Sequence, residues 1–289
     1  MRPDGPVQPD GTALLAAADG SSLQVPEGFD LFGAQFARHG DDLVLTGESS
    51  PPLTVVGYFS AASPPDLVTA KGPMLTGNVV EMLAGPRAPA QYAQADGPEG
   101  AVPIGKVETL TGTSTATRAT GETVELGRDD PVFEGDVIQT GAESTLGVRL
   151  EDGTLASMSA NSRLVLNEFV FEAGGSDNWM LVDLVEGAFA FLTGAIAPSG
   201  GMEITTPVAV MAVRGTMPIA FVMAPEGATE FFAGSDKDYE LLHLTTREII
   251  TLVSIGSGVV LTDPNAPIQS IEQLDGRPVR TGTAPRRRP

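Results

Sequence analysis

Apolar and polar residues alternate along this chain in short segments, each followed by a turn signal such as Asp152-Gly153. The alternation is clearest over 145–151, where Leu146, Val148 and Leu150 fall on one face of an extended segment. Three further segments are apolar on both faces, which is typical of strands buried between two layers: 163–171, 180–192 and 204–213. Short strands that are closed by Gly, Asp and Asn at short intervals predict an all-β fold.

The first hundred residues predict a smaller β-rich module. A strand pair is expected over 34–47 with a bend at His39-Gly40-Asp41, another strand over 52–59, and a hairpin over 13–25 that turns at Asp19-Gly20. One short helix is expected over 75–86. Thr76 can cap it, an apolar stripe follows at Val79, Val80 and Leu83, and Gly85-Pro86 ends it.

A stretch rich in Pro, Ala, Gly and Gln follows this helix and indicates a linker. We therefore expect an N-terminal module over 1–96, a linker over 97–103, a β domain over 104–273 and a basic tail over 274–289. A Thr-rich hairpin is expected over 105–126, and two or three strands over 240–262 could close the open end of the β domain.

Composition narrows the range of partners. The chain of 289 residues carries a net charge of −20, and such a surface repels the phosphate backbone of nucleic acids. It has no cysteine, which excludes disulfides and thiolate metal sites. The longest apolar run, over 207–225, has Arg214, Gly215 and Pro218 at its middle, so two buried strands are expected there rather than a membrane span. The first twenty residues lack the basic and apolar regions of a secretory signal peptide.

The sequence offers few candidates for catalysis or cofactor binding. The two histidines, His39 and His243, fall in expected strand pairs, and no cofactor is expected. Asp236 and Asp238 are weak candidates for calcium binding. Paired carboxylates could serve a carbohydrate hydrolase, and four pairs lie at expected turns: Asp129-Asp130, Glu134-Asp136, Glu151-Asp152 and Asp236-Asp238.

Four residues are candidates for an interaction or a structural role. Arg214 lies in a strongly apolar segment, where a buried charge needs a partner, and Glu168 or Glu203 could provide an internal ion pair. Alternatively, Arg214 lies at an edge that faces a partner. Trp179, the only tryptophan, follows the polar break at 174–178 and is expected to cover one end of the β core or to anchor a partner.

Five landmarks resemble those of the FecR domain of Gram-negative envelope proteins. They match in order: GDVIQTG at 135–141, LEDGT at 150–154, NSRLVLNEF at 161–169, EGAFAFLTG at 186–194 and TPVAVMAVRGT at 206–216. The resemblance implies a non-catalytic, solenoid-like stack of short strands over about 130–225 that works by contact with other proteins. Signalling members of the family are membrane-anchored regulators of sigma factors, whereas a second group carries the domain behind a small β module in large surface proteins.

The sequence therefore predicts a non-enzymatic envelope or cell-surface module that binds another protein or a glycan through a sheet edge or face. Two alternatives stay open, a periplasmic regulator of a sigma-factor pathway and a carbohydrate-active hydrolase. The resemblance implies a location in the periplasm, at the cell surface or outside the cell, while the absence of a recognisable signal peptide leaves a cytoplasmic location open.

Overall fold

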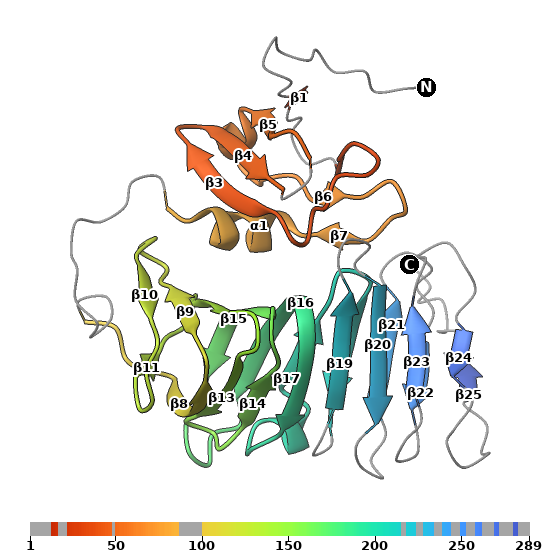
Figure 1. The fold of residues 1–289 in the computed structure, drawn as a ribbon. Coiled ribbons are helices and arrows are strands. Elements are labelled where there is room, and N and C mark those ends of the chain that lie inside the picture. Colours follow the sequence, from red (N-terminus) through yellow and green to blue (C-terminus); the bar gives the residue numbers. More distant parts are fainter. Residues whose placement is uncertain are drawn as a thin grey trace.

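The computed structural model describes residues 13–16, 22–47, 50–86 and 100–214, together with seven later strands at 218–223, 228–233, 239–243, 249–252, 258–261, 269–271 and 280–282. Most of the described chain is β-strand, as the sequence predicts. Figure 1 shows a smaller group of N-terminal elements above a larger set of strands.

Two small sheets, a 3-10 turn and one helix make up the N-terminal group. The first sheet has the order β1 (Ala13–Ala16), β5 (Leu53–Val56), β4 (Asp42–Thr46) and β3 (Gln35–His39). The second has the order β2 (Leu23–Gln24), β6 (Leu67–Val68) and β7 (Met74–Leu75). The turn η1 (Tyr58–Ser60) follows β5, and α1 (Gly77–Ala84) follows β7.

The helix predicted over 75–86 is confirmed, with the cap and the end that the sequence predicts. Thr76 is its N-cap, and the Thr76 hydroxyl accepts a hydrogen bond from the backbone N–H of Val79 at 3.4 Å. Gly85 ends it at a positive φ of 73°, a conformation that glycine adopts without strain. Val79 and Val80 are buried, so one face of the helix is fixed by packing.

The hairpin expected over 13–25 is wrong. β1 pairs in parallel with β5, and β2 pairs in parallel with β6, so the two segments lie in different sheets. Each of the two segments pairs with a later strand and not with the other segment. The expected turn at Asp19-Gly20 lies outside the described residues. The β3–β4 hairpin, with Gly40 at a φ of 66°, is confirmed.

The later strands form two facing sheets. The open sheet contains β11 (Pro131–Val132), β8 (Gly105–Thr111), β13 (Thr145–Leu150), β14 (Leu155–Met158), the second half of β16 (Trp179–Leu192), β19 (Pro218–Met223), β20 (Ala228–Ala233), β23 (Gly258–Leu261) and β24 (Gln269–Ile271).

The covered sheet contains β10 (Thr123–Glu125), β9 (Ser114–Thr117), β12 (Val137–Thr140), β15 (Arg163–Val170), the first half of β16, β17 (Met202–Thr205), β18 (Ala209–Val213), β21 (Tyr239–His243), β22 (Ile249–Leu252) and β25 (Arg280–Gly282). We name it for the N-terminal elements that lie on its outer face. A short 3-10 turn, η2 (Ala197–Ser199), precedes β17.

The two sheets curl around one apolar interior. Both contribute to it, for example Val148 and Phe191 from the open sheet and Ile138, Leu164 and Met211 from the covered sheet. The clean alternation predicted over 145–151 is confirmed, because Leu146, Val148 and Leu150 are all buried in this interior.

Three strand predictions need correction. The Thr-rich hairpin over 105–126 is smaller than expected, because β8 joins the open sheet and only β9 and β10 pair around the turn. The single strand expected over 204–213 is two strands, since the hydroxyl of Thr206 accepts the backbone N–H of Ala209 and closes a turn. The expected tail over 274–289 contains β25, which pairs with β22.

Candidate functional site

The residues of the sequence landmarks mostly hold turns and sheets together. Thr140 donates its hydroxyl to the carbonyl of Ser159 at 2.6 Å, and its oxygen accepts the backbone N–H of Ser162 at 2.9 Å. Gly187 is pressed against Ser162: a Cβ at Gly187 would lie 2.1 Å from the Ser162 hydroxyl oxygen. The landmarks at 135–141, 161–169 and 186–194 therefore meet at one junction between the two sheets.

Carboxylates that the sequence suggested as catalytic pairs hold local structure. Asp152 accepts hydrogen bonds from the backbone N–H and the hydroxyl of Thr154 and from the N–H of Ile196. Asp129 accepts from the ammonium of Lys106 at 3.0 Å, which lowers the pKa of this exposed carboxyl. Asp236 and Asp238 lie outside the described residues.

Arg118 and Asp136 form a fully buried ion pair. The guanidinium of Arg118 donates to Asp136, and the same carboxylate oxygen accepts the backbone N–H of Phe133 at 2.8 Å. The other oxygen of Asp136 has no hydrogen-bond partner. Burial raises the pKa of Asp136 to about 6, although Arg118 acts in the opposite direction.

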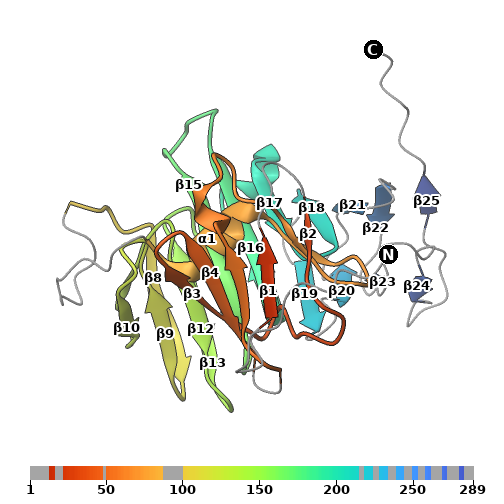
Figure 2. The ribbon, with the colours of Figure 1, turned by 90° about the horizontal axis from the view of Figure 1, so that it is seen from above.

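The N-terminal elements pack on the outer face of the covered sheet. Val137, Val165 and Val185 point away from the interior between the sheets and belong to the hydrophobic core of the N-terminal group. This contact explains why 163–171 is apolar on both faces. Figure 2 shows α1 over β15 and β16. The buried Arg163 extends the contact, because its guanidinium donates to the carbonyl of Ala34 at 2.9 Å.

A polar relay connects α1 to a buried carboxylate in the covered sheet. The side-chain amide of Asn78, in the first turn of α1, donates to Asn167 at 3.3 Å. The Asn167 amide in turn donates to Asp183 at 2.6 Å. Desolvation raises the pKa of Asp183 to about 6, while hydrogen bonds from Asn167 and Thr205 oppose the shift.

A small cavity lies beside this relay. Its volume is about 20 Å³, which is room for one water molecule. The cavity is lined from α1 and β7 on one side and from β16, β17 and the following turn on the other, including Thr76, Val79, Asp183, Thr205 and Thr206.

Sequence reasoning missed this buried cluster. A signal was available, because Asp183 interrupts the apolar run of 180–185 and Asn167 ends that of 164–166. Both polar positions sit in segments that are buried on both faces.

The four interaction candidates from the sequence gather on the uncovered part of the same outer face. Strand register places Glu168 beside Leu181, and Leu181 beside Glu203. Trp179 begins β16 and donates its indole N–H to Glu168 at 2.9 Å. Burial raises the pKa of the half-buried Glu203. We call the residues of this surface the acidic patch: Glu168, Val170, Trp179, Leu181 and Glu203.

Arg214 lies at the border of the acidic patch. It follows β18 directly, and its guanidinium Nε would lie 3.7 Å from a Cβ at Gly200. Arg214 is exposed, whereas the sequence led us to expect burial, because it lies past the last paired residue of β18. Its ion pair with Glu168 or Glu203 stays a prediction. The arginines that are buried among the described residues are Arg118 and Arg163.

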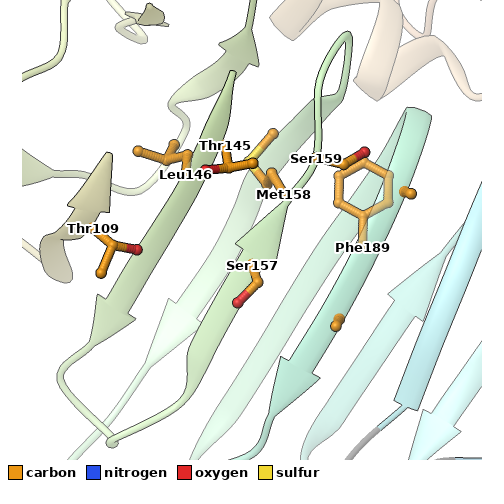
Figure 3. Close-up of a pocket in the computed structure, with 9 residues that line it drawn as sticks. Thr109, Thr145, Leu146, Ser157, Met158, Ser159 and Phe189 are labelled. Carbon is orange, nitrogen blue, oxygen red and sulfur yellow. The ribbon is translucent and has the colours of Figure 1, made fainter. Parts of the chain in front are cut away.

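The open sheet carries a groove of about 380 Å³ on its outer face (Figure 3). Small and hydroxyl side chains line it from four strands: Thr109 on β8, Thr145 on β13, Ser157 on β14, and Ala188 and Ala190 on β16. Gly147 lies between Thr109 and Ser157 in the register, so the centre of the groove has no side chain. The groove is a second surface on which a partner could lie.

No group of three or more metal-ligating side chains occurs among the described residues. Within the same residues, no helix is long and apolar enough to cross a membrane.

Comparison with known proteins agrees with the landmarks. Residues 136–231 match the family model described as FecR protein. No curated protein matches the chain. Two crystal structures, at 1.65 and 2.50 Å, of a Parabacteroides distasonis protein that is described as a proposed anti-sigma factor are similar at 16% identity and a TM-score of 0.38. The similarity covers 47% of this chain and 58% of that one, so this chain spans a little over half the length of its structural neighbour.

This protein is thus mainly β, and its N-terminal elements are docked on a curled pair of sheets. Its residues 136–231 match the FecR family model, as the sequence landmarks predict.

Proposed function

We propose that this chain is a non-enzymatic regulator that acts by contact with another protein of a sigma-factor signalling pathway. The observation that carries the proposal is the FecR match over 136–231, since signalling members of that family work in this way. The roles of the landmark residues support it, because Thr140, Ser162 and Gly187 hold the two sheets together and leave their outer faces for contact.

The arrangement of strands supports a stacked, solenoid-like description of the domain. Beyond β16, the strands alternate between the sheets in pairs: β17 and β18 in the covered sheet, β19 and β20 in the open sheet, and then β21 and β22 in the covered sheet again. Such a stack presents broad sheet faces, and broad faces suit a protein partner. We place the chain in the cell envelope, where FecR proteins act.

A second function fits the same structure, an envelope or cell-surface module that binds a protein or a glycan. The docking of the N-terminal elements on the FecR sheet favours it, because the sequence resembles surface proteins that carry a small β module before a FecR domain. The two functions differ in the identity of the partner, and this can be measured.

Site-specific photocrosslinking in the source cell would test the proposal. A benzophenone amino acid is placed at Leu181 in the acidic patch, at Ser157 in the groove, and at the exposed Glu125 of β10 as a control. We expect Leu181 or Ser157, but not Glu125, to capture a sigma-factor regulator, a transducer or a sigma factor. Capture of a surface protein or a glycan would favour the second function. Turnover of a carbohydrate by the purified chain would contradict both.

A further inference from the structure

The acidic patch has a chemical character that indicates what would bind there. We propose that it binds a positively charged amphipathic helix of a partner protein, which docks beside α1 on the same sheet face. This inference rests on the proposed function and names the kind of partner that the regulator contacts.

The register of the strands sets the spacing of the two carboxylates. Glu168 on β15 is paired with Leu181 on β16, and Leu181 is paired with Glu203 on β17. Neighbouring strands are about 4.8 Å apart, so the two glutamates are roughly 10 Å apart with an apolar side chain between them. The patch therefore suits two cationic groups that flank an apolar group at that spacing.

The same sheet face already carries a helix. α1 packs on the covered part, where Val79 and Val165 belong to one hydrophobic core and Asn78 donates to Asn167. The acidic patch continues that face along β16, since Leu181 is two residues before Asp183 and points to the same side. A second helix would thus extend an interface that the fold already makes.

Charge and apolar exposure favour a cationic partner. The chain has a net charge of −20, so a basic segment is attracted to it over distance. Val170 is 55% exposed, and the half-exposed ring of Trp179 lies on the same side of the sheet. The carboxyl of Glu203 is half-buried, so a cation that paired with it would be partly shielded from solvent.

A helix rises about 1.5 Å per residue, so lysines at positions i and i+7 are about 10.5 Å apart on one side. Leucines at i+3 and i+4 lie between them on the same face. A synthetic peptide with two such Lys-x-x-Leu-Leu-x-x-Lys repeats in an Ala and Gln background is therefore the probe. The control peptide has Glu in place of every Lys.

Trp179 provides the readout, because it is the only tryptophan in the chain and lies inside the patch. We expect the lysine peptide to shift Trp179 emission to shorter wavelength in the full chain, with saturation in the micromolar range. The double variant Glu168→Gln/Glu203→Gln should bind at least tenfold more weakly. The matched control Glu151→Gln, an exposed carboxylate in the turn after β13, should bind as the parent does.

Three outcomes would overturn the inference: no emission change with the lysine peptide, equal binding of the glutamate peptide, or unchanged affinity in the double variant. A fourth is emission that shifts to longer wavelength when residues 283–289 are deleted, because the basic end of this chain would then be the occupant. Peptide binding and cellular crosslinking are separate tests. Peptide binding together with crosslinks to a protein outside sigma-factor signalling would keep the helix site and reject the proposed pathway.

Discussion

Gly187 lies where β16 leaves the covered sheet and enters the open sheet. Its φ is 108°, a value that residues with a side chain rarely adopt. A Cβ there would also lie 2.5 Å from the Cα of Ser162, so neither backbone nor neighbour leaves room for a methyl group.

We expect Gly187→Ala to lower the free energy of unfolding by more than about 2 kcal/mol, because backbone strain and a steric clash add. The matched control is Gly40→Ala, which also has a positive φ of 66° but no atom within 4 Å of the added Cβ. The control should cost about 1 kcal/mol. Urea unfolding of both variants measures the difference, and equal losses would contradict the steric explanation.

The buried pair of Arg118 and Asp136 makes a different prediction at the same scale. Arg118→Met leaves the Asp136 carboxylate buried without its cation, which should cost about 3–5 kcal/mol near neutral pH. The loss should be smaller at pH 5, since protonation of Asp136 removes the uncompensated charge. Melting temperatures at pH 5 and pH 8 test this.

Arg149→Met is the control for that experiment. Arg149 pairs with Glu108 at 2.7 Å, but both side chains are more than a third exposed, so the loss should stay below about 1 kcal/mol. If Arg149→Met lowered stability as much as Arg118→Met, burial of the ion pair would not determine how much its removal costs.

At the scale of elements, α1 is tied to the covered sheet through Asn78, Asn167 and Asp183. Because burial raises the pKa of Asp183 from its ordinary value of 3.8 to about 6, the folded protein binds this proton more tightly than the unfolded chain does. The resulting stability is fully present below about pH 4 and is lost as the pH rises through 6.

We therefore expect Asp183→Asn to flatten the decline in stability between pH 5 and pH 7 by about 1 kcal/mol, because the side chain no longer titrates. Asn can still accept from Asn167, so the relay stays intact. Thermal unfolding across this pH range measures the slope. Asp136 also has a pKa of about 6, so part of the slope should remain in the variant. An unchanged slope would contradict the role of Asp183.

At the scale of the whole molecule, the N-terminal elements and the covered sheet share one apolar contact through Val137, Val165 and Val185. Val165→Asp places an unpaired charge in that contact. We expect amide hydrogens of α1 to exchange at least tenfold faster in this variant, while those of β13 and β14 keep their protection. Hydrogen exchange with mass spectrometry reads both regions.

Val170→Asp is the matched control, because Val170 lies on the same strand and the same side but is 55% exposed. It should leave the exchange of α1 unchanged. Equal acceleration in both variants would mean that the charge destabilises β15 itself and not the contact.

Local patterns predicted single elements better than the contacts between elements. The cap at Thr76, the stripe at Val79 and Val80 and the alternation over 145–151 follow from neighbours in sequence, and each was confirmed. The hairpin over 13–25 was wrong because pairing with β5 and β6 depends on distant segments. Likewise, no pattern near Asp183 specifies that Asn78, about a hundred positions earlier, lies over it.

The residues of the candidate surface could be predicted from the sequence, but their common position in the fold could not. Trp179, Glu168 and Glu203 were each identified from their local sequence, yet only the strand register brings them onto one face, with Arg214 directly after β18 at its border. The groove on the open sheet carried no signal, since Thr, Ser, Gly and Ala at its positions are ordinary strand and turn residues.

One strand, β16, contributes to the acidic patch at Trp179 and Leu181 and to the groove at Ala188 and Ala190. Side chains alternate along a strand, so a slip by a single residue would turn Leu181 inward and Phe189 outward together. The side chains that both outer surfaces present therefore depend on the same register of β16. A ligand that shifted β16 by one residue at the acidic patch would therefore also change which side chains line the groove on the other sheet.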